Sequence, residues 1–194
     1  MSQDVFELVK QLDTTEVETQ MALQCAPFIM GLRVSNLFVV RNEKLHELYD
    51  MLQDSRIYYM ELIKGDMKTT LFLYNKEAIL DYMSDDYVKC AMSGMGYADM
   101  DFQEMLHLFK LRYEAYMSGN GEFPHEMGFF LGYPYEDVVG YINNDGKNSL
   151  FTGYWKVYED VSKKVKLFQK FESAKDLVIR YIAAGLSIPE IRLG

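Results

Sequence analysis

Cysteine, histidine and tryptophan are scarce in this chain. Its 194 residues include two cysteines, three histidines and a single tryptophan. Cys25 and Cys90 are too few and too far apart in the sequence for a disulfide framework or a cysteine-based zinc site. We therefore expect two free thiols, as is usual in a reducing compartment.

The chain also lacks long apolar runs and an excess of positive charge. No apolar segment approaches the roughly 18 to 20 residues that span a bilayer. The acidic, amphipathic residues 1–13 resemble neither a secretory signal nor a transit peptide. The formal net charge of −9 argues against binding to nucleic acids or anionic membranes. We expect a cytoplasmic protein with neither partner, and we interpret the one basic cluster, Lys163, Lys164 and Lys166, as a solvated helix face.

Familiar catalytic and phosphate-binding signatures are missing from the sequence. There is no GxGxxG or GxxxxGK loop, and Gly94-Met95-Gly96 is too short and lacks a basic residue. A GxSxG elbow and an HExxH motif are also missing. These motifs therefore do not predict a reaction for the protein.

Residues 56–74 give the clearest strand signal. Residues 56–63 and 69–74 are rich in aromatic and β-branched side chains and flank a five-residue loop that contains Gly65, a pattern that predicts a β-hairpin. Residues 149–158 have the composition of a third strand, whereas residues 31–41 are compatible with a short strand or an extended loop.

The remaining segments show mostly helical spacing. Helices are predicted near residues 4–12, 43–52, 75–83, 99–117 and 160–184, with others after Thr14 or Thr15 and after Asp85, and Pro27 is expected to interrupt the second. These elements predict an α+β fold, in which a small antiparallel or mixed sheet is covered by several helices. With 49% hydrophobic residues, the whole chain, residues 1–194, is expected to form a single domain.

Residues 123–141 depart most from generic amphipathic sequence. Pro124 suits the first position of a helix, which would place His125 and Glu126 at its start. The helix is expected to end at Gly132, before Tyr133-Pro134, and a second helix should follow with Glu136 and Asp137 in its first turn. Gly128 and Gly132 in so apolar a segment indicate close approach of another backbone.

Several short motifs carry a family resemblance. They are Cys-Ala-Pro at residues 25–27, Asn-Leu-Phe at 36–38, the Phe-Pro-His-Glu run at 123–138 and Gly-Tyr-Trp-Lys-Val-Tyr at 153–158. Together they resemble an uncharacterised bacterial family, the domain of unknown function DUF3793, whose relatives are associated with anaerobic bacteria. The resemblance implies no activity, because none is known for the family.

One functional hypothesis is a cysteine-dependent enzyme that carries out acyl or thiol transfer. A cysteine becomes nucleophilic when a nearby histidine favours the thiolate, so Cys25 could pair with His125, with Glu126 or Asp137 orienting the imidazole. Against this hypothesis, Cys25 occupies an apolar helical face, and free cysteine is among the most buried residue types.

A second hypothesis is a binding or regulatory protein. Tyr133, Tyr154 and Trp155 could line a pocket with Lys156 and His125 at its rim, able to hold a flat or anionic small molecule or a segment of a protein partner. Asn36, from the Asn-Leu-Phe motif, completes the candidate site. The alternative is that these aromatic side chains only pack in the core. We predict the binding protein, with the cysteine enzyme as the alternative.

A metal site is not predicted. Adjacent residues on a helix point about 100° apart, so His125 and Glu126 are poorly placed to chelate one ion with His46 or His107. Relatives commonly carry a histidine before the Cys-Ala-Pro motif, where this chain has Gln24. The sequence names no cofactor, no ligand and no oligomeric state.

Overall fold

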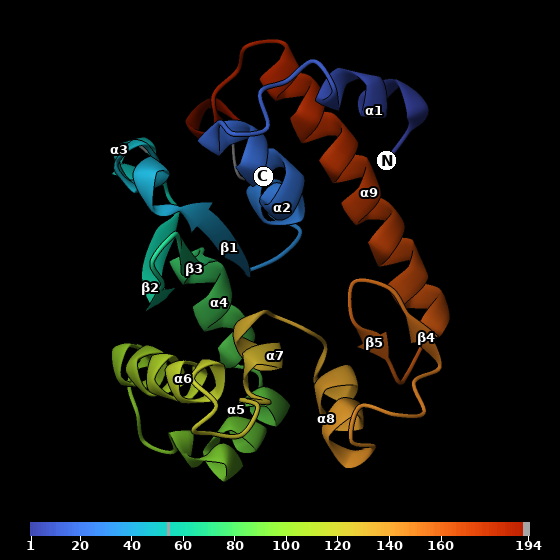
Figure 1. The fold of residues 1–194 in the computed structure, drawn as a ribbon. Coiled ribbons are helices and arrows are strands. Elements are labelled where there is room, and N and C mark those ends of the chain that lie inside the picture. Colours follow the sequence, from blue (N-terminus) through green and yellow to red (C-terminus); the bar gives the residue numbers. More distant parts are fainter. Residues whose placement is uncertain (54, 192–194) are drawn as a thin grey trace. The chain divides into compact units, whose positions relative to one another are not determined.

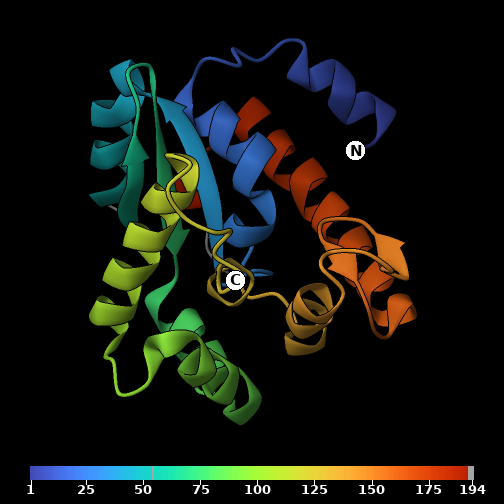
Figure 2. The same ribbon diagram turned by 60° about the horizontal axis from the view of Figure 1, so that its bottom comes forward.

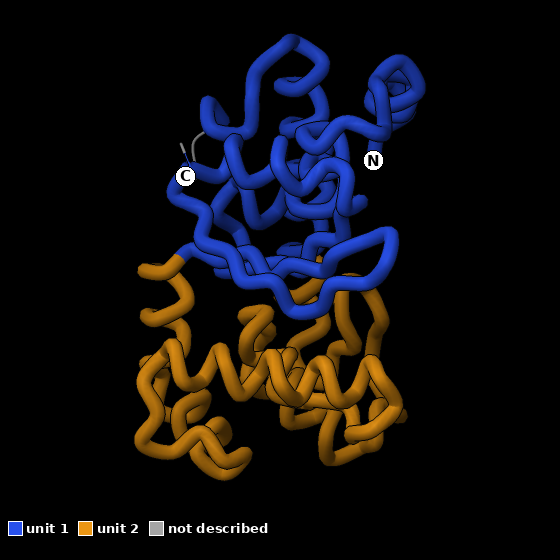
Figure 3. The backbone as a smooth tube through the Cα atoms, turned by 60° about the vertical axis from the view of Figure 1, so that its left-hand side comes forward, with its two compact units in different colours: residues 1–75, 166–194 blue, residues 76–165 orange. Residues whose placement is uncertain are grey.

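The structure, a computed structural model, describes residues 1–53 and 55–191. The chain forms two compact units, which Figure 3 colours separately. Unit 1 consists of residues 1–75 and the chain from residue 166 onward, and unit 2 consists of residues 76–165. We predicted that residues 1–194 form a single domain. Whether the two units fold together as one domain is not tested by this division, so the single domain stays a prediction.

Unit 1 contains the main sheet (Figures 1 and 2). Its strands are β1 (Ser35–Arg41), β2 (Tyr58–Lys64) and β3 (Lys68–Tyr74), in the order β1-β3-β2, and β3 pairs antiparallel with both neighbours. The predicted hairpin is therefore confirmed, with a shift in register between Glu61 and Ile63. The α+β class is confirmed as well.

The place predicted for the third strand was wrong. β1 completes the sheet, and residues 149–158 instead form a separate small hairpin in unit 2, between β4 (Phe151–Thr152) and β5 (Lys156–Val157). A tight turn through Gly153 and Tyr154 joins the two strands, and in it the Gly153 N–H donates to the Trp155 carbonyl at 3.0 Å.

Helices cover the sheet of unit 1. They are α1 (Gln3–Val9), α2 (Val17–Ile29), α3 (Leu45–Gln53), which follows a 3-10 turn at Asn42–Lys44, and most of α9 (Val161–Ala183), after which a 3-10 turn spans Ile188–Glu190. Side chains from all four helices join Phe38, Val40, Leu71 and Leu73 of the sheet in one buried cluster. α2 lies beside β1 in both views (Figures 1 and 2).

Pro27 lies inside α2, so the predicted interruption there was wrong. Met30 still donates to the Ala26 carbonyl as the C-cap, and the helix ends at Ile29, two residues before Gly31, whose φ of 68° places it in the left-handed region. Proline removes one backbone N–H from the helix, but the helix can continue past it where tertiary packing stabilises the helix. Pro27 is buried, so packing in the core stabilises α2 at this position.

Unit 2 begins with helices that agree closely with the prediction. α4 (Lys76–Met83) is followed by α5 (Asp86–Met92), whose first turn is capped by the Asp85 side chain. A π-helical turn at Ser93–Tyr97, which contains Gly94 and Gly96, follows α5. α6 (Phe102–Met117) starts with a capping box between Asp101 and Glu104.

The break between α7 (Met127–Phe130) and α8 (Tyr135–Asn143) also agrees with the prediction. Gly132 has a φ of 67°, its N–H donates to Phe129, and the Tyr133 N–H donates to Gly128, a Schellman motif that ends α7. The Phe130 ring stacks on Phe109 of α6 at 4.4 Å, which fixes α7 on α6. Within the described residues, no helix is both long and apolar enough to cross a membrane.

Candidate functional site

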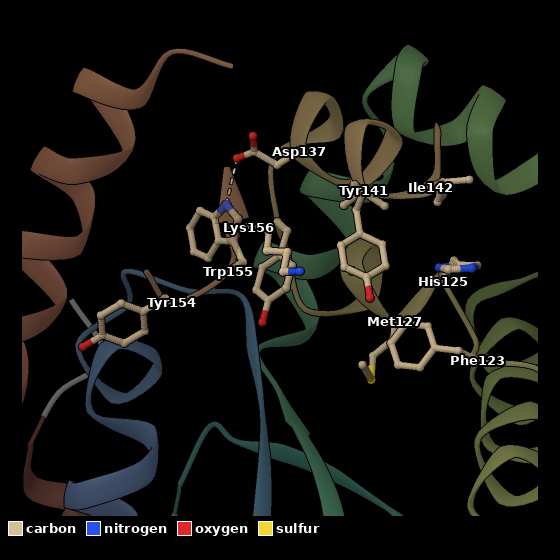
Figure 4. A pocket seen from close by; sticks show the side chains of 12 residues that line it. Phe123, His125, Met127, Asp137, Tyr141, Ile142, Tyr154, Trp155 and Lys156 are labelled. Carbon is tan, nitrogen blue, oxygen red and sulfur yellow. Dashed lines mark hydrogen bonds between the residues drawn. The ribbon is translucent and has the colours of Figure 1, made fainter. Parts of the chain in front are cut away.

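A partly open cavity of about 200 Å³ lies in unit 2, between the segment that leads into α7, the helix α8 and the β4–β5 hairpin (Figure 4). Six of the residues expected to bind a ligand or to act with Cys25 line it: His125, Tyr133, Asp137, Tyr154, Trp155 and Lys156. The other lining residues are mostly apolar, namely Phe123, Met127, Gly128, Val138, Tyr141 and Ile142. The cavity thus brings together the Pro-His-Glu and Gly-Tyr-Trp motifs.

His125 lines one end of the cavity. It follows Pro124 in the turn before α7, and its ring lies 5.2 Å from the Phe123 ring and 5.8 Å from the Tyr141 ring, centroid to centroid. Its Nδ1 atom is buried and has no hydrogen-bond partner among the described residues. A buried polar atom without a partner costs about 1–3 kcal/mol, so a ligand atom that hydrogen-bonds to Nδ1 would be stabilised.

Trp155 forms the opposite end. Its ring stacks on Tyr133 at 4.8 Å, and its indole N–H donates to the Asp137 carboxylate at 2.7 Å (Figure 4). The other oxygen of Asp137 accepts from the backbone N–H of Tyr158 at 2.8 Å and of Glu159 at 3.4 Å. Asp137 thereby fixes the hairpin on α8 and holds the indole in one orientation.

Lys164 lies behind Asp137. Its side chain is 2% exposed, and its ammonium forms an ion pair with Glu136 and lies 3.6 Å from Asp137. The solvated helix face predicted for the lysine cluster was therefore wrong for Lys164. Burial alone would raise the pKa of Glu136, but the hydrogen bond and charge of Lys164 outweigh it and lower that pKa. The positive charge of Lys164 partly offsets the negative charges of Glu136 and Asp137 next to the cavity.

Lys156 lies over the cavity between Trp155 and Tyr141 (Figure 4). Its ammonium donates to the Gly146 carbonyl and lies 6.0 Å from the centroid of the Tyr141 ring. It has no carboxylate partner in the part of the chain that the structure describes.

Glycines allow the walls of the cavity to close. A Cβ added at Gly128 would lie 2.8 Å from Val138, and one added at Gly140 would lie 2.5 Å from Tyr158, closer than side chains can pack. Gly128 therefore lets α7 approach α8, and Gly140 lets the hairpin approach α8. The close approach of another backbone expected at Gly128 was wrong, because the atoms that approach it belong to the Val138 side chain.

Glu126 serves a different network from His125. It is 4% exposed and accepts from the Tyr97 hydroxyl at 2.9 Å and from the Arg112 guanidinium at 3.1 Å. Burial and the charge of Glu126 raise the pKa of Tyr97. Glu126 thus ties the start of α7 to α6 and to the π-helical turn. Within the described residues, its hydrogen-bond and ion-pair partners are Tyr97 and Arg112, and His125 is not among them.

Cys25 and Asn36 lie in unit 1 and are not among the residues that line the cavity. Cys25 is 0% exposed, and burial raises the pKa of its thiol to about 12, even though the Asn36 amide contacts the sulfur at 3.2 Å. Asn36 also donates to the Gln24 and Leu37 carbonyls and accepts from Arg33. These contacts give Asn36 a role in joining α2 to β1. The Asn36 contact favours a Cys25 thiolate, but burial outweighs it and opposes thiolate formation.

Sequence patterns missed part of the cavity wall. Phe123, Met127, Tyr141 and Ile142 are not among the predicted site residues, yet all four line the cavity. Their signal was their position, because each lies within about four residues of a candidate polar side chain on a helical turn. Across residues 1–53 and 55–191, no group of three or more His, Cys, Asp or Glu side chains is arranged to hold a metal ion.

Comparison with known proteins gives one match. The family described as "Protein of unknown function (DUF3793)" matches residues 21–192. No curated protein and no solved structure matches the chain significantly.

Proposed function

We propose that this chain, which belongs to the DUF3793 family of proteins of unknown function, binds a small, flat, largely apolar molecule in the cavity beside Trp155. The observation that carries the proposal is that aromatic walls line one cavity together with His125, whose buried Nδ1 atom has no partner among the described residues. Binding sites for small molecules commonly combine apolar walls with a few fixed polar groups.

The size of the cavity limits the ligand. A cavity of about 150 Å³ holds one benzene molecule, and this one measures about 200 Å³. Drug-sized ligands occupy about 300–1,000 Å³. The cavity therefore suits a single substituted ring better than a segment of a protein partner.

The walls suit a flat molecule. Trp155 and Tyr133 are already stacked, and Tyr141 lies across the cavity beside His125. Aromatic rings prefer offset or edge-to-face contacts, which contribute about 0.5–1.5 kcal/mol beyond burial. A ring bound here would meet aromatic partners from both motifs.

Binding or regulation is proposed in preference to cysteine-dependent catalysis. The thiolate that such catalysis requires is opposed by the complete burial of Cys25 and by the rise of its pKa to about 12. The proposal further assigns the protein to the cytoplasm, without nucleic-acid or membrane partners, on the basis of its net charge of −9 and its free thiols. Cell fractionation checks the compartment, and recovery in a membrane or secreted fraction would contradict it.

Fluorescence of the only tryptophan, Trp155, tests the proposed binding. A panel of monocyclic aromatic and heterocyclic metabolites is titrated into the native protein, and at least one is expected to give a saturable change. Ile142→Phe fills the cavity and should abolish that change. Leu111→Phe, the same kind of change at a side chain 48% exposed on α6, should preserve it.

The proposed function fails under either of two results. The first is a flat Trp155 signal across the whole panel at millimolar concentrations. The second is a response that Ile142→Phe leaves intact, which would place the ligand elsewhere.

A further inference from the structure

We infer that the ligand of this cavity carries an anionic group, of the class of small aromatic carboxylates, and that Lys156 binds that group. The inference rests on the proposed function and names the chemistry of its ligand. It follows from the distribution of charges and free hydrogen-bonding capacity along the cavity wall.

The carboxylate of the cavity wall is already satisfied. One oxygen of Asp137 accepts two backbone N–H groups, and the other accepts the indole N–H of Trp155 and faces the ammonium of Lys164 at 3.6 Å. A carboxylate offers about four acceptor sites in all. A cationic ligand would therefore find most of the acceptor sites of Asp137 used and its negative charge partly offset by Lys164, which also pairs with Glu136.

The ammonium of Lys156, in contrast, has few hydrogen-bond acceptors and no carboxylate partner within the described residues. A lysine ammonium has three donors, and for Lys156 one of them reaches the Gly146 carbonyl. The remaining contact is a distant one with the Tyr141 ring, at 6.0 Å. Lys156 forms no ion pair within the described part of the chain, so two donors and a full positive charge remain for an anion.

Lys156 is held where an anion on a bound ring would meet it. β5 carries it directly after Trp155, and the Gly146 carbonyl anchors its ammonium over the cavity, in front of Tyr141 (Figure 4). A ring between Trp155 and Tyr141 would therefore place a carboxylate at the open side, beside Lys156, where partial hydration lowers the cost of binding a charge.

The experiment compares three ligands of nearly equal shape: benzoate, benzamide and benzylamine. Each is titrated into the native protein, with Trp155 fluorescence and calorimetry as the measurements. Benzoate is expected to bind at least about fivefold more tightly than benzamide, as for one partly exposed charged contact. Raising the salt concentration from about 0.05 M to 0.5 M should reduce this preference, because exposed charges are screened.

Two lysine variants locate the anion. Lys156→Gln should remove the preference for benzoate, so that benzoate and benzamide bind with equal affinity. Lys147→Gln makes the same change at an exposed lysine of unit 2 that does not line the cavity, and it should retain the preference. Lys156 is itself exposed, so circular dichroism is expected to show a native fold in both variants.

The outcomes separate this inference from the function on which it rests. Equal binding of benzoate and benzamide, blocked by Ile142→Phe, would overturn the anionic ligand and leave the proposed binding function standing. Tighter binding of benzylamine, or a benzoate preference that persists in Lys156→Gln, would overturn it in the same way. A ligand with a millimolar Kd would saturate the site at about 20 mM. If none of the three ligands changes the Trp155 signal up to that concentration, the inference that the cavity binds an aromatic carboxylate is refuted.

Discussion

Replacement of Asp137 by asparagine is the most informative perturbation of unit 2. The carboxylate accepts hydrogen bonds from Trp155 and from two backbone N–H groups and faces the buried Lys164 ammonium. Asparagine keeps the shape but removes the charge and turns one acceptor oxygen into an NH2 donor. That donor would point at either the indole N–H or the backbone donors, which leaves at least one of them unpaired.

The magnitude follows from these contacts. A hydrogen bond to a charged group contributes about 1.5–3 kcal/mol, and removing one member of a buried ion pair costs about 3–5 kcal/mol. Lys164 retains Glu136 as a partner, so the ion-pair loss is only partial. We expect Asp137→Asn to lower the free energy of unfolding of unit 2 by about 2–4 kcal/mol.

Urea denaturation provides the assay. Trp155 fluorescence reports unit 2 alone, because this residue is the only tryptophan, and circular dichroism reports both units. Asp145→Asn is the matched control, since Asp145 is exposed and has a φ of 49°, which asparagine tolerates well. A loss below about 0.5 kcal/mol for Asp137→Asn, the range of ordinary surface substitutions, would refute the role given to this carboxylate.

Three further predictions concern packing, pH and thiol reactivity. Gly140→Ala should lower the free energy of unfolding of unit 2, measured in urea, by about 1–3 kcal/mol, because the added Cβ would lie 2.5 Å from Tyr158. Gly94→Ala should be neutral, because its added Cβ would have no atom within 4 Å, and equal effects of the two changes would contradict the close packing of Gly140 on Tyr158. The raised pKa of Tyr97 means that its neutral form stabilises the fold below about pH 10 and that this contribution is lost as the pH rises further. Tyr97→Phe should therefore flatten the alkaline fall of the urea midpoint, and an unchanged fall would exclude Tyr97 as its source. Iodoacetamide should modify the exposed Cys90 at least about a hundredfold faster than Cys25 at neutral pH, whereas comparable rates would restore the cysteine enzyme.

Local chemistry made parts of the fold predictable. The Asp101 capping box starts α6, and Gly132 with Pro134 separates α7 from α8, because cap and turn residues act on their own neighbours. The hairpin of β2 and β3 was predictable for the same reason, since its alternation and its glycine-containing loop are adjacent in the sequence.

Tertiary context decided the elements that the sequence pattern misplaced. β1 buries the polar Ser35 and Asn36, so it lacks the alternation expected of a half-buried strand. Residues 149–158 have stronger β propensity, but propensity reflects the surface that a strand can pack against, and this segment pairs only with itself. Pro27 shows the same effect, because packing in the core retained the helix.

The sequence motifs predicted which segments form the candidate site, but they did not predict which side chains contact one another around it. The sequence indicated His125, Tyr133 and Trp155 as one group, and the structure brings them to one cavity. The burial of Lys164 was not predictable, because a lysine among lysines is ordinarily solvated and its carboxylate partners lie about 28 residues away.

The most direct test of the proposed cavity is the NMR signal of the Trp155 indole N–H. A chain with one tryptophan gives one such signal, and this N–H lies at the cavity wall, bonded to Asp137. We predict that benzoate shifts the signal in a saturable way in the native protein and leaves it unchanged in Ile142→Phe. An indole signal that stays fixed while other amide signals move with benzoate would contradict the claim that this cavity is the binding site.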